Sequence, residues 1–190
     1  TQLTTARNTA LGTQNISANS TNVRIGSYAF SASSADGVTV SSVTITAGAT
    51  AFLQNLKVMV GGTQFGITQG TVASAGVYSF SGTPFTVAKG TTLYVDVYSD
   101  ILTGAASVSP VTSLSGLTGS GLTSYNAVSL SGGTVVGQGI TIAGQPTVTV
   151  AIDSATPAAG QLVMGSTGNS LASFRFTETS NVENVKITDL

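Results

Sequence analysis

The chain has 190 residues and a formal net charge of −1, and only 7% of its residues are charged. It contains no His, Cys or Trp, which excludes metal sites built on His or Cys, Cys nucleophiles and Ser-His-Asp triads. Thr, Ser and Gly contribute 30, 25 and 23 residues, so hydroxyl groups and the backbone supply most of the polarity. This composition argues against an enzyme.

The charge pattern and the hydropathy pattern exclude two classes of partner. The six basic residues are scattered singly, which leaves no patch to neutralise phosphates, so nucleic acid is not expected. No apolar run approaches the ~18 residues of a membrane span. The chain starts at Thr1 without a basic-then-apolar leader, as expected of a mature secreted product or an excised fragment. Because cytosolic domains usually carry about a quarter charged residues, we expect an extracellular, cell-surface location.

Alternation of apolar and polar residues, the period of a half-buried strand, runs through most of the chain. The first strands are predicted at 24–32 and 38–47. Apolar residues alternate on both sides of Gly61-Gly62, and a glycine pair supplies the positive φ angles of a tight turn. The sequence therefore predicts a β-hairpin over 54–67.

The clearest strand is predicted at 92–99, where every second residue is apolar. Strands at 71–80 and 85–88 precede it. A second hairpin is predicted at 126–142, with its turn at Ser131-Gly-Gly133. The last strands are predicted at 147–152, 171–177 and 182–188. No segment combines helical spacing with caps and good helix formers, so no helix is expected.

An internal repeat is the most informative feature of the sequence. Ile25-Gly-Ser-Tyr-Ala-Phe30 aligns with Leu171-Ala-Ser-Phe-Arg-Phe176, and Val40-Ser-Ser-Val-Thr-Ile45 aligns with Val182-Glu-Asn-Val-Lys-Ile187. In both copies the first Val has the opposite parity from the apolar residues that follow it. A straight strand cannot place them on one face, so a β-bulge or a switch between sheets is predicted at this point.

The repeat suggests four regions. We expect an N-terminal arm at 1–13, a complete sandwich at 14–100, a Ser/Thr/Gly-rich connector with a β-hairpin at 101–145, and the first strands of a second, incomplete unit at 146–190. Two or three strands cannot bury both faces of a sheet. The second unit is therefore completed either within a longer repeat protein or by strands from a neighbouring subunit. The span 101–152 contains no charged residue, and within it 134–152 offers one proline, Pro146, and no charge to protect its strand edges.

The sequence resembles the Ig-like repeats of large secreted bacterial surface proteins, the S-layer-like and adhesin-like class rich in Thr, Ser and Gly. The resemblance lies in the Phe-x-Phe strand, the Val-x-x-Val-x-Ile strand, the Gly-Gly hairpin, and the segments 89–97 and 147–157. The resemblance implies an all-β, Ig-like antiparallel β-sandwich and a structural or adhesive role outside the cell. It carries over no functional residues.

One strand face is a candidate glycan contact, because it combines aromatic rings with carboxylates that suit a sugar or Ca²⁺. An alternative is an ordinary solvated strand face, since no Asp-rich loop accompanies it and Ca²⁺ takes six to eight oxygens. The four residues of this face are Tyr94, Asp96, Tyr98 and Asp100.

Two sequons, Asn15-Ile-Ser17 and Asn19-Ser-Thr21, are candidate N-glycosylation sites. Chance occurrence is the alternative in a chain this rich in Ser and Thr. The leading functional hypothesis is a noncatalytic structural subunit of a cell-surface assembly, an S-layer sheet or a pilus-like filament, in which identical subunits pair their strands. An adhesin or carbohydrate-binding module on a surface stalk is the second hypothesis, and a glycan-active enzyme is the third.

Overall fold

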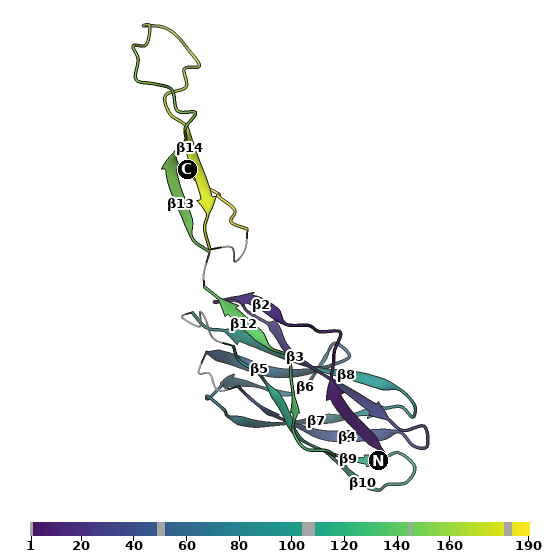
Figure 1. The fold of residues 1–190 in the computed structure, drawn as a ribbon. Coiled ribbons are helices and arrows are strands. Elements are labelled where there is room, and N and C mark those ends of the chain that lie inside the picture. Colours follow the sequence, from purple (N-terminus) through teal and green to yellow (C-terminus); the bar gives the residue numbers. More distant parts are fainter. Residues whose placement is uncertain (1, 49–51, 104–108, 145, 181–183) are drawn as a thin grey trace. The chain divides into compact units, whose positions relative to one another are not determined.

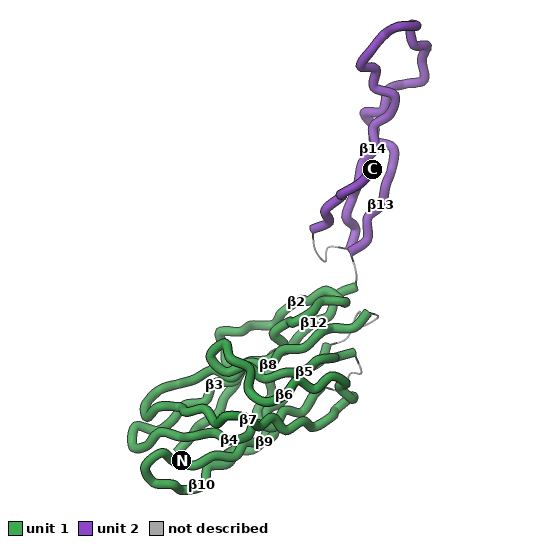
Figure 2. Tube along the Cα trace, turned by 180° about the vertical axis from the view of Figure 1, so that it is seen from behind, with its two compact units in different colours: residues 1–144 green, residues 145–190 purple. Residues whose placement is uncertain are grey.

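The computed structural model describes residues 2–48, 52–103, 109–144, 146–180 and 184–190. The fold is all-β, as predicted, and the described residues contain no helix (Figure 1). The chain divides into two compact units, Thr1–Gly144 and Gln145–Leu190 (Figure 2).

Unit 1 is a β-sandwich of two antiparallel sheets. The first sheet has the order β1 (Leu3–Arg7), β3 (Val23–Ala32), β8 (Thr92–Ile101), β5 (Leu53–Val60) and β6 (Thr63–Thr71). The second has the order β10 (Ala127–Ser129), β9 (Ser113–Gly121), β4 (Val38–Thr46) and β7 (Val77–Val87), and β11 (Val135–Val136) also pairs with β9. A separate pair, β2 (Gln14–Ser17) and β12 (Ile140–Ala143), is parallel.

The core lies between the two sheets and draws on the alternating apolar residues of both. Phe85 of the second sheet packs against two rings of the first, with ring centroids 6.2 Å from Phe30 and 5.0 Å from Phe65. Ile16 and Ile142 extend this core beneath the parallel pair, and both are buried. Burial of apolar side chains from both sheets is what holds unit 1 together.

The strongest sequence signals are confirmed. The predicted hairpin is β5 and β6, with Gly61 and Gly62 at φ of 56° and 86°. The predicted bulge is present in β4, where the register shifts between Val40 and Ser42 against both neighbouring strands. Ser41 is the extra residue opposite β9, so Val40 and Val43 are both fully buried despite their opposite parity.

The expected arm at 1–13 and connector at 101–145 require correction, because both contribute strands to unit 1. Leu3–Arg7 forms the edge strand β1 against β3, and β2 pairs with β12. The Ser/Gly tract 113–121 is β9, an inner strand of the second sheet. The sandwich therefore needs residues on both sides of the expected 14–100.

The predicted second hairpin at 126–142 is also wrong. Its two halves do not pair with each other: β10 and β11 both pair with β9, and 140–143 forms β12. β10 and β11 pair with two different parts of β9, and Gly132 and Gly133, with φ of 91° and 84°, lie in the segment between β10 and β11. The separate strands predicted at 71–80 and 85–88 are largely one strand, β7, whose register against β4 shifts across 82–84.

Candidate functional site

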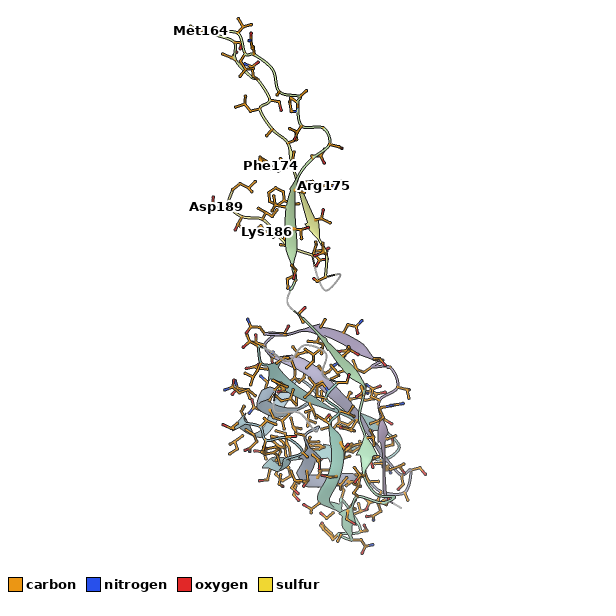
Figure 3. The ribbon with its side chains drawn as sticks, turned by 60° about the vertical axis from the view of Figure 1, so that its left-hand side comes forward. Met164, Phe174, Arg175, Lys186 and Asp189 are labelled. Atoms are coloured by element: carbon orange, nitrogen blue, oxygen red, sulfur yellow. The ribbon has the colours of Figure 1, made fainter. Side chains whose placement is uncertain are left out.

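Unit 2 contains two described strands, β13 (Val148–Ile152) and β14 (Phe174–Glu178), paired antiparallel (Figure 1). Val150 lies opposite Phe176, and Ile152 lies opposite Phe174. Successive side chains of a strand point to opposite faces, and Phe174 and Arg175 leave β14 on opposite sides (Figure 3). One face of the pair is therefore mainly apolar, with Glu178 opposite Val148 at one end, and its five apolar residues are Val148, Val150, Ile152, Phe174 and Phe176.

The β13–β14 pair reproduces the β1–β3 pair of unit 1. In unit 1, Thr5 lies opposite Phe30 and Arg7 lies opposite Tyr28. Advancing β1 by 145 positions and β3 by 146 positions gives the observed pairing of β13 and β14 throughout. The repeat seen in 25–30 and 171–176 therefore extends to the strand that precedes each of them.

Hydrogen bonds at both ends of the two pairs repeat as well. Asn8 donates its backbone N–H to Ser27 over 3.0 Å, and Asp153 donates to Ser173 over 2.8 Å. At the other end of the β1–β3 pair, Ser33 donates its N–H to Gln2 O over 2.9 Å. At the matching end of the β13–β14 pair, Thr179 donates its N–H to Thr147 O over 3.0 Å. Two bonds in each pair thus match at the same spacing, as expected if one pair repeats the other.

The turns that follow β1 and β13 also match. The Asn8 side chain accepts the N–H of Ala10 at 3.0 Å, and the Asp153 carboxylate accepts the N–H of Ala155 at 2.8 Å. Asn and Asp share this ability to cap their own turn two residues on. Unit 2 thus starts as a second copy of the unit 1 fold.

The two copies differ in what covers them. Tyr28 and Phe30 are completely buried in unit 1, whereas their counterparts Phe174 and Phe176 are 60% and 37% exposed. No described residue of unit 2 is buried. An isolated two-stranded ladder is marginally stable in water, and covering half-exposed side chains of this size is worth on the order of 1 kcal/mol each.

Residues 184–190 lie beside the apolar face without forming the predicted strand at 182–188, of which 182–183 fall outside the described residues. Val185 and Ile187, with Val148 and Phe176, line a groove of about 470 Å³. Their counterparts in β4 are hydrogen-bonded on both sides, by β7 and β9. Within the described part of unit 2 no strand corresponds to β7 or β9, which explains why this segment is not a strand.

The candidate glycan face lies on β8, in the middle of the first sheet, with its four side chains on the side away from the core. Only Tyr94 is largely open to solvent, at 48% exposure, and Tyr98 is half-buried. Asp96 lies 3.6 Å from Arg24, and its Oδ1 is buried without a hydrogen-bond donor among the described residues. A ligand from solvent would meet the rings more readily than this carboxylate.

Asp100 is occupied by neighbours within the fold. It accepts hydrogen bonds from the Asn55 side chain at 2.7 Å and from the Asn22 backbone at 2.6 Å. These bonds, with a smaller contribution from the charge of Lys57, hold the pKa of Asp100 below its usual value. Asp100 therefore links two segments through hydrogen bonds, the loop that precedes β3 and the strand β5. This is a structural role.

The described residues contain no cluster of three or more His, Cys, Asp or Glu side chains that could hold a metal ion. Ca²⁺ binding at the β8 face stays a prediction. None of the described segments is a helix long and apolar enough to cross a membrane. Asn15 and Asn19 are both exposed, Asn15 on β2 and Asn19 in the turn after it, so both sequons are accessible to a glycosylating enzyme. Their modification stays a prediction.

Buried polar groups that the sequence did not single out tie the loops of unit 1 together. Asp36 accepts hydrogen bonds from the backbone and hydroxyl groups of Thr123 and Ser124, which lowers its pKa to about 2, chiefly through the Thr123 hydroxyl. Gln138 accepts from the Ser27 N–H at 2.8 Å and donates to Asn8 O at 2.7 Å. Neither residue belongs to a sequence motif, because its partners lie far away in the chain.

A comparison with known protein families found no family that matches this chain, and a comparison with curated proteins found no match. The exposed apolar face of β13 and β14, with the edge of β14 beside it, is the candidate functional site that rests on most observations.

Proposed function

We propose that this protein is a noncatalytic structural subunit of an extracellular cell-surface assembly, a sheet or a filament, whose subunits are joined by β-strand pairing. The single observation that carries the proposal is the β13–β14 pair, which repeats β1–β3 but leaves its apolar face exposed. A two-stranded pair cannot bury both of its faces by itself, so the exposed apolar side chains of β13 and β14 favour packing against further strands.

The surface chemistry supports the same proposal. Edge strands of water-exposed proteins are usually protected by charges, whereas β13 (Val148–Ile152), which has one described partner strand, carries none. A surface rich in hydroxyl groups can be buried against copies of itself at a low cost, because it carries few charges to desolvate. An Ig-like class and a location outside the cell rest on the sequence resemblance and belong to this proposal.

Electron microscopy of the native material tests the proposal directly. Ordered sheets or filaments are expected. A monodisperse monomer that stays monomeric at millimolar concentration would contradict it.

A second candidate function, an adhesin or carbohydrate-binding module, is favoured by the aromatic pair on β8. Tyr94 and Tyr98 lie four residues apart on the outer face, where their rings could stack on a sugar. A glycan array probed with the native chain and with the variant carrying Tyr94→Ala and Tyr98→Ala tests it. Binding that disappears in the variant supports this function, and its absence in the native chain removes it.

A further inference from the structure

A small pocket lies at the end of unit 1 where β1 ends. Its volume is about 180 Å³. One wall is the turn that follows β1, and the other is the segment that precedes β12. The polar and glycine residues that line it are Arg7, Thr9, Gly12 and Thr13 from the turn, and Gln138 and Gly139 from the segment. All of them belong to unit 1.

Hydrogen bonds hold both walls of the pocket in place. Gln138 is buried, donates to Asn8 O over 2.7 Å and accepts the Ser27 N–H over 2.8 Å. Gln14, which follows the turn, donates its N–H to Gly139 O over 3.3 Å. The two walls are thus fastened to each other and to β3, and the pocket is formed before any ligand enters.

One cation and two hydroxyl groups line the pocket. Within the described residues, the Arg7 guanidinium has no acidic side chain at salt-bridge distance, and the hydroxyls of Thr9 and Thr13 form no hydrogen bond. None of the described lining residues is acidic, and Arg7 is the one basic residue among them. A single guanidinium flanked by hydroxyls suits a monoanion such as a carboxylate.

Unit 2 shows that the turn forms without the arginine. The turn after β13 repeats the turn after β1, because Asp153 caps it as Asn8 does, two residues on. Ile152 occupies the position of Arg7. Since the same turn forms beside an aliphatic residue in one copy and beside a cation in the other, Arg7 contributes something other than the local fold.

Gly12 leaves open space at the pocket wall. Its φ lies outside the left-handed region that favours glycine. A Cβ added at this position would meet no atom within 4 Å. Neither the backbone conformation nor close packing therefore requires a glycine here, and what the missing side chain provides is room.

From these observations we infer that the pocket binds the carboxylate of an acidic sugar, a uronic acid unit. Arg7 pairs with the carboxylate through two parallel N–H···O bonds, and the hydroxyls of Thr9 and Thr13 bond to the sugar hydroxyls. Sites for drug-sized ligands have roughly 300–1,000 Å³, so a pocket of about 180 Å³ holds one sugar ring. None of its lining residues belongs to the candidate glycan face of β8.

The probe is galacturonic acid, with galactose as the neutral sugar and acetate as the carboxylate alone. Each is titrated into the full 190-residue chain, and backbone amide chemical shifts are followed by NMR. We expect saturable shifts of the amides of 7–13 and 137–139 with galacturonic acid and none with galactose. Acetate is expected to bind at least about fivefold more weakly, because it lacks the hydroxyl groups.

Two variants remove different features of the pocket. Arg7→Gln removes the charge, and Gly12→Val fills the open space while Arg7 stays, so each is expected to weaken binding at least about tenfold. Arg175→Gln removes an exposed arginine of unit 2 and is the control, with an expected change of less than about twofold. An unchanged thermal transition of unit 1 shows that the variants are folded.

The absence of saturable shifts with galacturonic acid would overturn the inference, as would equal binding of galactose or acetate. Native affinity in Arg7→Gln, or an equal loss in Arg175→Gln, would overturn it as well. The proposed function fails separately, because the pocket lies within unit 1 and its binding is measured on the monomer. A chain that binds galacturonic acid and never polymerises removes the assembly alone, and polymers of a chain without this binding remove the pocket alone.

Discussion

Phe176 lies directly opposite Val150 across β13 and β14, in the position that Phe30 and Thr5 hold across β1 and β3. The half-buried Thr5 of unit 1 is thus replaced by the exposed Val150 in unit 2, where no described residue is buried. An exposed apolar pair at the position of a pair with a half-buried threonine is costly unless another surface buries it. This pair is the basis of the assembly proposed above.

The stability of unit 1 is expected to fall in acid because of Asp36. Hydrogen bonds from Thr123 and Ser124 lower the folded-state pKa of Asp36 from 3.8 to about 2. A depressed pKa means that the stabilisation is present above pH 4 and is lost as the pH falls from about 4 to about 2. Thermal melts across this range are expected to show the loss in the native chain and a smaller one in Asp36→Asn, which also melts lower at pH 7.

The matched control is Asp189→Asn, a change at an exposed position of unit 2. It is expected to keep the native acid profile. The role given to Asp36 is wrong if Asp36→Asn and the native chain lose the same stability between pH 4 and pH 2.

An alkaline transition is expected from Tyr28. Burial raises the pKa of Tyr28 to about 12, and the hydrogen bond with Thr112 at 3.1 Å offsets part of the rise. Because the folded state disfavours the phenolate, this contribution is present below pH 10 and is lost as the pH rises from about 10 to about 12. The dependence should be absent from Tyr28→Phe, which costs about 1–3 kcal/mol at pH 7 by leaving the buried Thr112 hydroxyl without this partner.

Tyr94→Phe, on the exposed face of β8, serves as the control for Tyr28→Phe. Urea denaturation at pH 7 and at pH 11 measures both effects. A Tyr28→Phe chain that is as stable as the native one at pH 7 would contradict the account.

Gln138 is expected to stabilise the end of the β1–β3 pair, because its side-chain amide forms hydrogen bonds with the backbone there. Its amide oxygen accepts the Ser27 N–H in a buried site, so Gln138→Ala leaves that N–H without its acceptor and should cost about 1–3 kcal/mol. The Asn8 and Ser27 carbonyls keep hydrogen bonds from the Leu11 and Asn8 N–H groups. Denaturant unfolding measures the loss. The exposed Gln64 provides the comparison, since Gln64→Ala should change stability by less than about 0.5 kcal/mol. Equal effects of the two changes would remove the special role of Gln138.

The sequence predicted the strands whose apolar residues alternate strictly, and it missed those whose burial depends on partners. β8 and the β5–β6 hairpin follow the alternation, and the parity conflict at Val40 identified the bulge. β9 was missed because Leu114 and Leu117 are three residues apart. The register against β4 shifts between Thr44 and Ile45, and this shift lets both leucines reach the core.

The ends of unit 1 were misjudged for a similar reason. β1 has one buried residue, Leu3. The strand is otherwise held by backbone hydrogen bonds to β3, which no local sequence pattern predicts. For the candidate site, the alternation of Val148, Val150 and Ile152 was visible in the sequence. Their pairing with β14 in the register of β1–β3 required the structure.

The apolar face can be tested by removing its aromatic rings. Sedimentation velocity should compare the native chain, the variant with Phe174→Ser and Phe176→Ser, and the control Ile67→Ser, which removes a 75% exposed side chain from unit 1. We expect concentration-dependent association of the native chain and of Ile67→Ser, and at least about a tenfold weaker association of the double variant. Association of the double variant at native strength, or an equal loss in Ile67→Ser, would contradict the claim that β13 and β14 join the subunits.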